Sequence, residues 1–167
     1  MESQEPVSLK PAAPTFVNEM LDDRLVAALG TLDSDGKIHL VPMWFRHEGK
    51  TILLPTSSRS RKARNVQRHP HASLMIHQAR SAIEVRGVLI RGAVQIVRGE
   101  EAKELNRSIH LRYISARRLA RDVVVRSLTV NDDATLVIAM EDLTTWNLTE
   151  LEMTRVLAEH GDAYALS

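Results

Sequence analysis

Short apolar segments separated by close turns constrain the fold of this chain more than any other feature of its sequence. Six segments have the alternating or apolar pattern of β-strands, and they span residues 25–32, 37–45, 51–56, 72–77, 83–97 and 134–146. The turns at residues 33–36 and 47–50, which separate the first three segments, contain the glycine that hairpin turns favour. We therefore expect the first three segments to form an antiparallel three-stranded meander.

Prolines and glycines interrupt three of these strands. Pro42 lies inside the second predicted strand, and Pro55 lies near the end of the third. Proline has no amide hydrogen, so it does not fit the middle of a central strand and indicates a sheet edge, a bulge or a ligand contact. Gly87 and Gly92 interrupt the long fifth segment, as glycines do where a barrel strand bends.

Helical periodicity is found in residues 15–22, 58–68 and 99–121, and the last of these segments is the longest. Short strands with close turns and one long helix late in the chain favour an antiparallel barrel over parallel βαβ units. We therefore predict a mainly β fold with flanking helices. Side chains fill the interior of a small barrel, so a large ligand would lie outside it or at a subunit boundary.

The length of 167 residues fits one domain. We assign residues 1–14 to a flexible lead, residues 15–147 to the folded domain and residues 148–167 to an acidic C-terminal extension. The chain has no cysteine, which excludes disulfides and cysteine-ligated metals and fits the reducing cytoplasm. No apolar run approaches the roughly 18 residues of a membrane helix, so we expect no membrane partner.

Charge is unevenly distributed although the net charge is only +1. Residues 49–83 contain seven Lys and Arg and no Asp or Glu, whereas residues 131–167 contain eight Asp and Glu and one Arg. Within the basic region, residues 56–65 combine a strand end, hydroxyl groups, a helix start and several cations. Groups of these kinds hold phosphate in proteins, through hydrogen bonds and charge. The alternative is a solvated basic helix without a ligand.

The same part of the chain resembles a known family. The motifs that carry the resemblance are, in order, Gly36, Pro42-Met43-Trp44-Phe45, Gly49, Thr56, Ser60-Arg61-Lys62-Ala63, Asn65, Pro70 and Gly92-Ala93-Val94. In this order they resemble the flavin-binding split-barrel proteins related to pyridoxamine 5′-phosphate oxidase. The resemblance implies a six-stranded antiparallel split β-barrel that forms a homodimer, with each flavin in a groove between the two subunits.

The resemblance also assigns residues to cofactor binding. They are Pro42, Met43, Trp44, Thr56, Ser60, Arg61, Lys62 and Asn65. The flavin phosphate would be held by Thr56, Ser60, Arg61 and Lys62. Asn65 would support that loop or reach the ligand. The three strand residues would lie along the isoalloxazine ring and offer backbone donors and acceptors to it. Because the ring carries the redox chemistry, we assign no catalytic side chain.

Departures from the oxidase narrow the expected activity. The strand from Leu40 to Phe45 has Leu and Phe where the oxidase that makes pyridoxal phosphate has Arg and Lys. The C-terminal arginine-leucine-proline type substrate motif of that oxidase is also absent. We therefore expect a different oxidoreductase of the same type, with FMN or the deazaflavin coenzyme F-420 as cofactor and an unknown small molecule as substrate.

Other functions compete with this hypothesis. A protein that stores or senses flavin without catalysis would use the same residues, and some split-barrel relatives bind haem, so both alternatives stay open. His69, His71 and His77 lack the spacing of standard metal ligands, and we predict no metal site. Aromatic residues make up 4% of the chain and none lies in residues 46–112, which argues against nucleic-acid binding by the basic segment.

Overall fold

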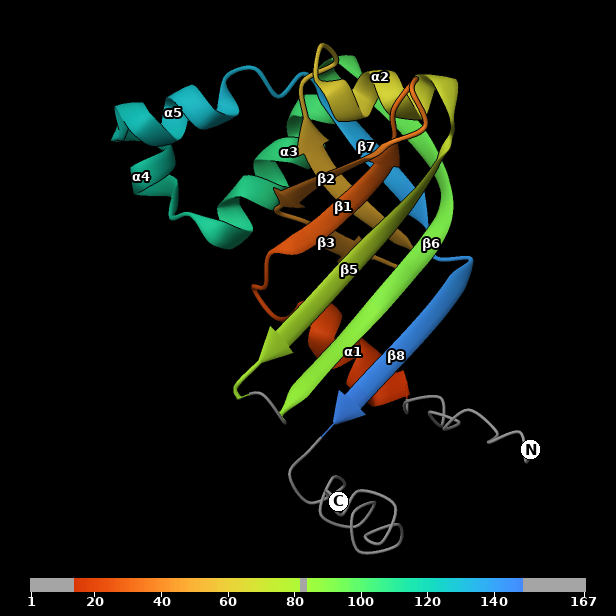
Figure 1. Cartoon of the computed structure of the whole chain (residues 1–167). Helices are drawn as coiled ribbons and strands as arrows, with labels where there is room; N and C mark the ends of the chain where they lie inside the picture. The colour runs from red at the N-terminus through yellow and green to blue at the C-terminus, as the bar shows by residue number, and fades with distance from the viewer. Residues whose placement is uncertain (1–13, 82–83, 149–167) are drawn as a thin grey trace, which may run out of the picture.

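The computed structural model describes residues 14–81 and 84–148 (Figure 1). Within these residues the helices are α1 (Pro14–Asp22), α2 (Arg61–Arg68), α3 (Gly99–Tyr113), α4 (Ala116–Arg121) and α5 (Val123–Thr129). The strands are β1 (Ala27–Leu32), β2 (Ile38–Met43), β3 (Arg46–Glu48), β4 (Thr51–Thr56), β5 (His71–Ala79), β6 (Val85–Arg98), β7 (Ala134–Ala139) and β8 (Asp142–Leu148). The fold is mainly β with helices on its flanks, as the sequence predicts.

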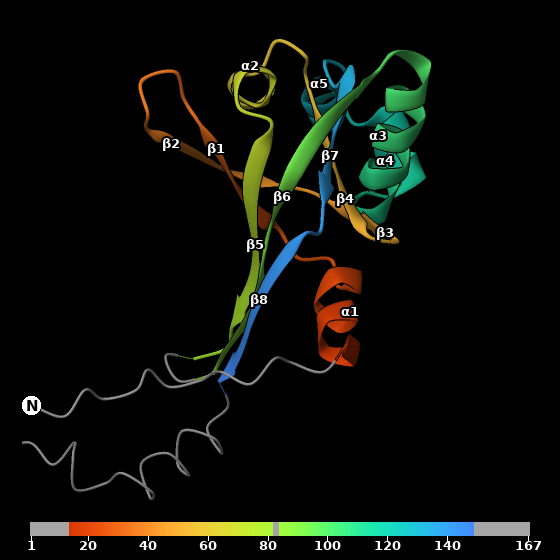
Figure 2. The ribbon, with the colours of Figure 1, turned by 90° about the vertical axis from the view of Figure 1, so that its right-hand side faces the viewer.

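The strands form one antiparallel sheet in the order β2-β1-β5-β6-β7-β4-β3, and β8 pairs with β6 in addition. Strand β6 has 14 residues, which is long enough to pair with two successive strands along one edge. Its residues 94–98 pair with β7 and its residues 85–91 pair with β8. Both views show that β7 and β8 lie beside different parts of β6 and point in different directions (Figure 1, Figure 2). The predicted antiparallel split β-barrel is therefore confirmed.

The described residues contain eight strands instead of the six predicted, because the last predicted strand divides into two and the short strand β3 was not predicted. The strand predicted at residues 37–45 ends at Met43 as β2, and β3 begins after Trp44 and Phe45, partly within the turn predicted at residues 47–50. Residues 134–146 form β7 and most of β8, which are interrupted at Met140 and Glu141. The predicted three-stranded meander is wrong, because β2 pairs with β1 whereas β3 pairs with β4.

Two glycines of β6 allow this double pairing. A Cβ atom added at Gly92 would collide with the carbonyl oxygen of Ala139, at the end of β7. A Cβ atom added at Gly87 would collide with the indole ring of Trp146 on β8. Both glycines thus lie where a second strand approaches β6 too closely for a side chain.

The two prolines lie where the sheet is incomplete. Pro42 is on β2, which is the outermost strand beside β1. Pro55 is on β4, where β7 lies on one side but β3 reaches only as far as Leu53 on the other. The missing amide hydrogens are tolerated at such edges, in agreement with the sequence-based expectation.

Helices cover the flanks of the barrel (Figure 2). Helix α3 packs on β4, β6 and β7, while α1 packs beside β3, β5 and β6. The predicted helix over residues 99–121 is interrupted after Tyr113, and α4 begins after Ser115, whose hydroxyl accepts a hydrogen bond from the Arg118 amide. The sequence did not predict α5. Among the described helices, none has the length and apolar character needed to cross a bilayer.

Apolar side chains from all sides of the sheet fill the barrel. Fully buried examples are Leu29 on β1, Leu74 on β5, Ile90 on β6, Leu136 on β7 and Phe45 at the β2–β3 break. Aromatic and aliphatic side chains of this size stabilise a core by roughly 1.5–3 kcal/mol each when fully buried. The interior is therefore packed, and the surface remains as the place for a large ligand.

The close approach at Gly92 leads to a stability prediction. We expect Gly92→Ala to lower the free energy of unfolding by about 1–3 kcal/mol or more, because the new methyl group meets backbone that cannot rotate away. Gly30→Ala on β1 is the matched control, since its nearest neighbour would be the Ser73 oxygen at 3.6 Å. Urea denaturation of both variants measures the difference, and equal stability would contradict the steric explanation.

Candidate functional site

The end of β4 and the start of α2 form the centre of the candidate site. The hydroxyls of Thr56 and Ser60 lie 2.9 Å apart. Ser60 is also the N-cap of α2, where its Oγ accepts a hydrogen bond of 3.2 Å from the Ala63 amide. This cap explains why the helix begins here, because serine satisfies an amide that has no partner within the helix. The structure thus brings together two hydroxyls that the sequence assigned to phosphate binding.

Lys62 lies beside these hydroxyls in the chain, in the first turn of α2, and is half-buried. Within the described residues, no hydrogen bond or ion pair engages its ammonium group. Burial lowers the pKa of Lys62, and the nearby carboxylate of Asp132 opposes that shift. A half-buried ammonium that no described residue contacts by a hydrogen bond or ion pair has the chemistry of an anion-binding group.

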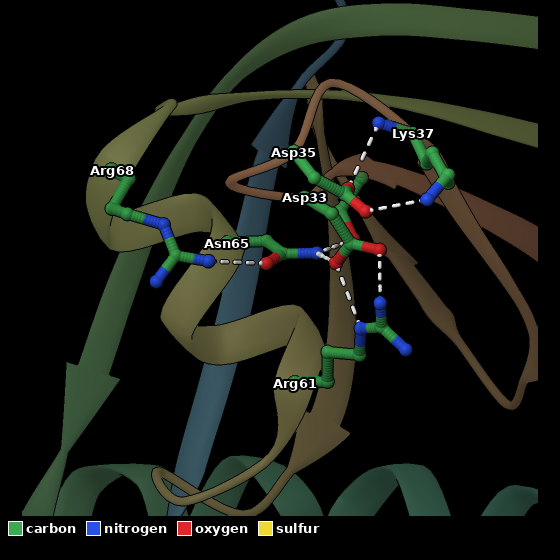
Figure 3. A network of polar contacts seen from close by, with 7 residues as sticks. Asp33, Asp35, Lys37, Arg61, Asn65 and Arg68 are labelled. Carbon is green, nitrogen blue, oxygen red and sulfur yellow. Dashed lines mark hydrogen bonds and ion pairs between the residues drawn. The ribbon is translucent and has the colours of Figure 1, made fainter.

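Arg61, the neighbouring cation, is already engaged (Figure 3). Its Nε and NH2 atoms donate hydrogen bonds of 2.8 and 2.5 Å to the two carboxylate oxygens of Asp33, at the end of β1. Asp33 is buried although Arg61 is more than half exposed. These hydrogen bonds lower the pKa of Asp33, and the same contact raises the pKa of Arg61. Arg61 therefore attaches α2 to the β1–β2 hairpin.

Asn65 belongs to the same polar cluster and is fully buried. Its side-chain amide donates to Thr31 Oγ1 at 3.1 Å and to Asp33 Oδ1 at 2.7 Å, and its oxygen accepts from Arg68 at 2.8 Å (Figure 3). Asn65 therefore connects α2 to the β1–β2 hairpin, and its predicted role at the phosphate-binding loop stays a prediction. A second carboxylate in the same hairpin, Asp35, bonds to Lys37.

A further carboxylate holds the loop between β4 and α2. Asp133, which precedes β7, accepts hydrogen bonds of 2.6 Å from the Ser58 amide and 2.7 Å from the Ser58 hydroxyl. These bonds lower the pKa of Asp133. The position of Asp133 depends on buried Asn106 of α3, which donates to the carbonyl oxygens of Asp132 and Ala134. The loop is thus fixed from a second side.

The break between β2 and β3 lies against α3. The Trp44 ring stacks on Tyr113 with a centroid separation of 5.2 Å, and its edge meets His110 at 6.1 Å. The Tyr113 hydroxyl donates to the carbonyl oxygens of Leu25 and Phe45 and accepts from the Phe45 amide. Tyr113 therefore fixes the backbone at the position where β2 ends.

The other two strand residues assigned to the ring differ in exposure. Pro42 is exposed and Met43 is buried in the core, so only the backbone of Met43 is accessible to a ligand. The free edge of β2 has no strand neighbour in the described part of the chain. Backbone donors and acceptors on this edge agree with the interaction that the sequence analysis expects.

His110 and Asp132 connect the two halves of the candidate site. His110 Nε2 lies 3.0 Å from Asp132 Oδ2, and the His110 ring is buried. Asp132 in turn acts electrostatically on Lys62, while His110 contacts Trp44. The residues around 42–44 and those around 56–62 are thus linked through α3 and the segment before β7.

Sequence reasoning missed this link. Asn106 and His110 are four residues apart on the buried face of α3, and polar residues at that spacing on an otherwise apolar face were the available signal. The signal for Asp132 and Asp133 was weaker, because their contacts connect segments about 70 residues apart. Among residues 14–81 and 84–148, no group of three or more His, Asp or Glu side chains is arranged to hold a metal ion.

The family model described as pyridoxamine 5′-phosphate oxidase matches residues 13–147, which include nearly all of the described structure. The chain belongs to the pyridoxamine 5′-phosphate oxidase family. No curated protein matches the chain in a sequence search.

Solved structures agree with this family fold. A conserved hypothetical protein from Mycobacterium tuberculosis is 23% identical with a TM-score of 0.70, covering 85% of this chain and 89% of that one. A protein described as an F420 reductase is 21% identical with a TM-score of 0.57, covering 76% and 94%. A haem storage protein from Vibrio cholerae is 15% identical with a TM-score of 0.57, covering 81% and 94%. At these identities the likeness establishes the fold.

This member of the pyridoxamine 5′-phosphate oxidase family also has an exposed apolar face. A groove of about 670 Å³ crosses β1, β2, β5 and β6, and its apolar lining includes Leu32, Ile38, Leu40, Met75 and Leu89. Ile38 and Leu40 are 75% and 65% exposed, which is unusual for neighbouring residues on one strand face. Arg91 and Asp142, which form an ion pair of 3.1 Å, line the same groove.

The Asp33 cluster predicts an acid-sensitive fold. Because its pKa is lowered in the folded state, ionised Asp33 contributes stability above its unfolded pKa of about 3.9, and this contribution is lost as the pH falls through the folded pKa. Asp33→Asn should be less stable at pH 7 and should lose less stability between pH 5 and pH 2 than the unmodified protein. Thermal unfolding across this range tests it, with exposed Glu104→Gln as the control. Parallel curves for Asp33→Asn and the unmodified protein would contradict it.

Tyr113 provides a second test. Tyr113→Phe keeps the ring stacked on Trp44 but leaves the Leu25 and Phe45 backbone groups without their hydroxyl partner. We expect the free energy of unfolding to fall by about 1–3 kcal/mol, as measured by urea denaturation. Unchanged stability would show that these backbone groups are satisfied by water.

Proposed function

We propose that the protein is a flavin- or deazaflavin-dependent oxidoreductase that acts on a small molecule in the cytoplasm. The observation that carries this proposal is the half-buried, unpaired ammonium of Lys62 beside the hydroxyl pair of Thr56 and Ser60, in a chain of this family. An ammonium and two hydroxyls are suitable donors for a phosphate oxygen. The donor set therefore fits the phosphate-bearing end of such a cofactor.

The residues of the predicted site divide into two roles in this proposal. Thr56, Ser60 and Lys62 would hold the phosphate directly. Arg61 and Asn65 would position α2, because their side chains are committed to Asp33. This division modifies the sequence-based assignment, in which Arg61 contacts the phosphate.

The ring of the cofactor would lie along residues 42–44. Pro42 and the free edge of β2 would face it, Met43 would contribute its backbone, and Trp44 would be held by Tyr113. The bound ring supplies hydride transfer between the cofactor and the substrate. The chain supplies binding, orientation and exclusion of water, and we assign no side chain as acid or base.

We further propose that a second copy of this chain covers the apolar groove, giving a homodimer with the cofactor near the subunit boundary. Family membership supports this, together with the exposure of Ile38 and Leu40 beside Leu32. An apolar face of this kind associates because burying it removes apolar surface from water. A packed barrel interior also leaves the subunit boundary as the place for a large ligand.

Haem binding or non-catalytic storage of the cofactor is the second candidate. Its support is the structural likeness to a haem storage protein. Among the described residues His110 is the one buried histidine, and its Nε2 already faces Asp132. That contact favours the flavin-type cofactor over histidine-ligated haem.

The first test is to record the visible absorption spectrum of the purified protein and then titrate the stripped protein with FMN and with F-420. We expect Lys62→Ala to weaken binding of the cofactor about 10-fold or more, because a charge-assisted hydrogen bond is lost. Lys50→Ala, at the opposite end of β4, is the control with the same change of charge. A Soret band with no flavin or deazaflavin binding would overturn the proposal in favour of haem.

The dimer has its own test. Ile38→Asp combined with Leu40→Asp should convert a dimer to a monomer at micromolar concentration, as measured by light scattering after gel filtration. Both residues are exposed in the single chain, so the fold should tolerate the change. Val123→Asp, at a residue 78% exposed on α5, is the control. A monomeric unmodified protein would contradict the proposal.

A further inference from the structure

A second cavity lies on the side of the barrel that carries the short helices. Figure 1 shows α4 and α5 outside the sheet, beside α3. Between these helices and the segment before β7 is a cavity of about 330 Å³. Its lining includes none of Thr56, Ser60 and Lys62, the donors assigned to the cofactor phosphate. A volume near the lower limit for ligand pockets suits one small molecule.

Two arginines from different helices line this cavity. Arg107 is on α3 and Arg126 is on α5. Within the described residues, neither guanidinium forms an ion pair or a side-chain hydrogen bond. Lys103 also lines the cavity, but its ammonium is paired with Glu100. The two guanidiniums therefore offer the planar donor arrangement that carboxylates bind.

Two carboxylates line the same cavity. Asp133 uses both of its oxygens to hold Ser58. Asp132 uses Oδ2 for its contact with buried His110, whereas its Oδ1 accepts no hydrogen bond from the described residues. A carboxylate has about four acceptor positions, so Asp132 has room for a further donor. The cavity thus presents an acceptor as well as donors.

The charges that line the cavity balance. With the pair of Lys103 and Glu100 set aside, two arginines and two aspartates remain. Within residues 14–81 and 84–148, no ion pair joins either arginine to either aspartate, so opposite charges line one cavity without contacting each other. A simple anion would be attracted by the guanidiniums and repelled by the carboxylates, and a simple cation would meet the reverse. A ligand with both charges is attracted by both groups.

We propose that this cavity binds a small zwitterion of the α-amino acid type. The carboxylate of the ligand would accept hydrogen bonds from Arg107 and Arg126, and its ammonium would donate to Asp132 Oδ1. Leu119 and Val130 also line the cavity and would contact an apolar side chain. This site goes beyond the proposed function and does not depend on it, because the donors assigned to the cofactor lie outside the cavity.

Calorimetric titration of the whole chain with L-valine tests the proposal. L-valine is the probe because its side chain is small and apolar. Two analogues separate its charges, since isovalerate lacks the ammonium and isobutylamine lacks the carboxylate. We expect L-valine to bind at millimolar concentration or below, and each analogue to bind about 10-fold or more weakly, because each loses a charge-assisted contact.

Substitutions then assign each contact. Arg107→Gln and Arg126→Gln should each weaken L-valine binding and reduce its advantage over isobutylamine, which has no carboxylate to contact them. Both arginines are exposed, so the fold should tolerate these changes. Asp132→Asn should weaken L-valine binding and reduce its advantage over isovalerate, while the asparagine keeps an acceptor or donor for His110.

Two control variants make the same changes of charge outside the cavity. Arg117→Gln is on α4 and Glu104→Gln is on α3, and both residues are exposed. Neither residue lines the cavity, so both variants should bind L-valine as the unmodified protein does. Weakening of equal size in the controls would show an effect of overall charge, and it would overturn the proposal.

The outcomes separate this inference from the proposed function. Failure of L-valine to bind would overturn the inference, and so would an analogue that binds as tightly, because it would indicate a simple anion or cation site. Saturating FMN or F-420 should not displace L-valine. Displacement would assign the cavity to the cofactor site and overturn the inference while the proposed function stands. Failure of both cofactors to bind would overturn the proposed function alone.

Discussion

The rest of the structure depends on the pairing of β6 with two strands along one edge. Residues 94–98 of β6 hold β7, and residues 85–91 hold β8. The change from one strand to the other occurs at Gly92, where a side chain would collide with Ala139. Because β7 also pairs with β4, this arrangement sets where β4 ends and where α2 begins, and the candidate site lies at that junction.

Helix α3 holds the parts of the candidate site in place. Tyr113 fixes the backbone at the β2–β3 break, Asn106 fixes the segment before β7, and His110 lies between Trp44 and Asp132. Arg112 extends the same helix to the end of α1 by donating to the Leu21 and Asp23 carbonyl oxygens. One helix therefore holds three segments that are distant in sequence, through hydrogen bonds and ring contacts.

The electrostatics of the site differ from those of the sequence segment that forms it. Residues 56–65 are strongly basic in the sequence. In the folded chain, however, two carboxylates from other segments bind to them: Asp33 binds Arg61, and Asp133 binds Ser58. Among the described cations of this segment, only Arg61 forms an ion pair, so Arg59, Lys62 and Arg64 keep their positive charges. The net charge that a ligand meets is thus smaller than the count of Lys and Arg indicates, because carboxylates from other segments offset part of it.

The sequence by itself determined the class of fold and the short helix after β4, and it singled out Thr56 and Ser60 as candidate phosphate ligands. Turn residues, alternating apolar positions and helix caps act between residues close in the chain, so their effects can be predicted locally. Only the tertiary structure decided that Arg61 and Asn65 bind Asp33, that β2 and β3 belong to different hairpins, and that Asp133 holds Ser58. These outcomes depend on which distant segments the sheet brings together, and pairing across 28 to 75 residues leaves no local pattern.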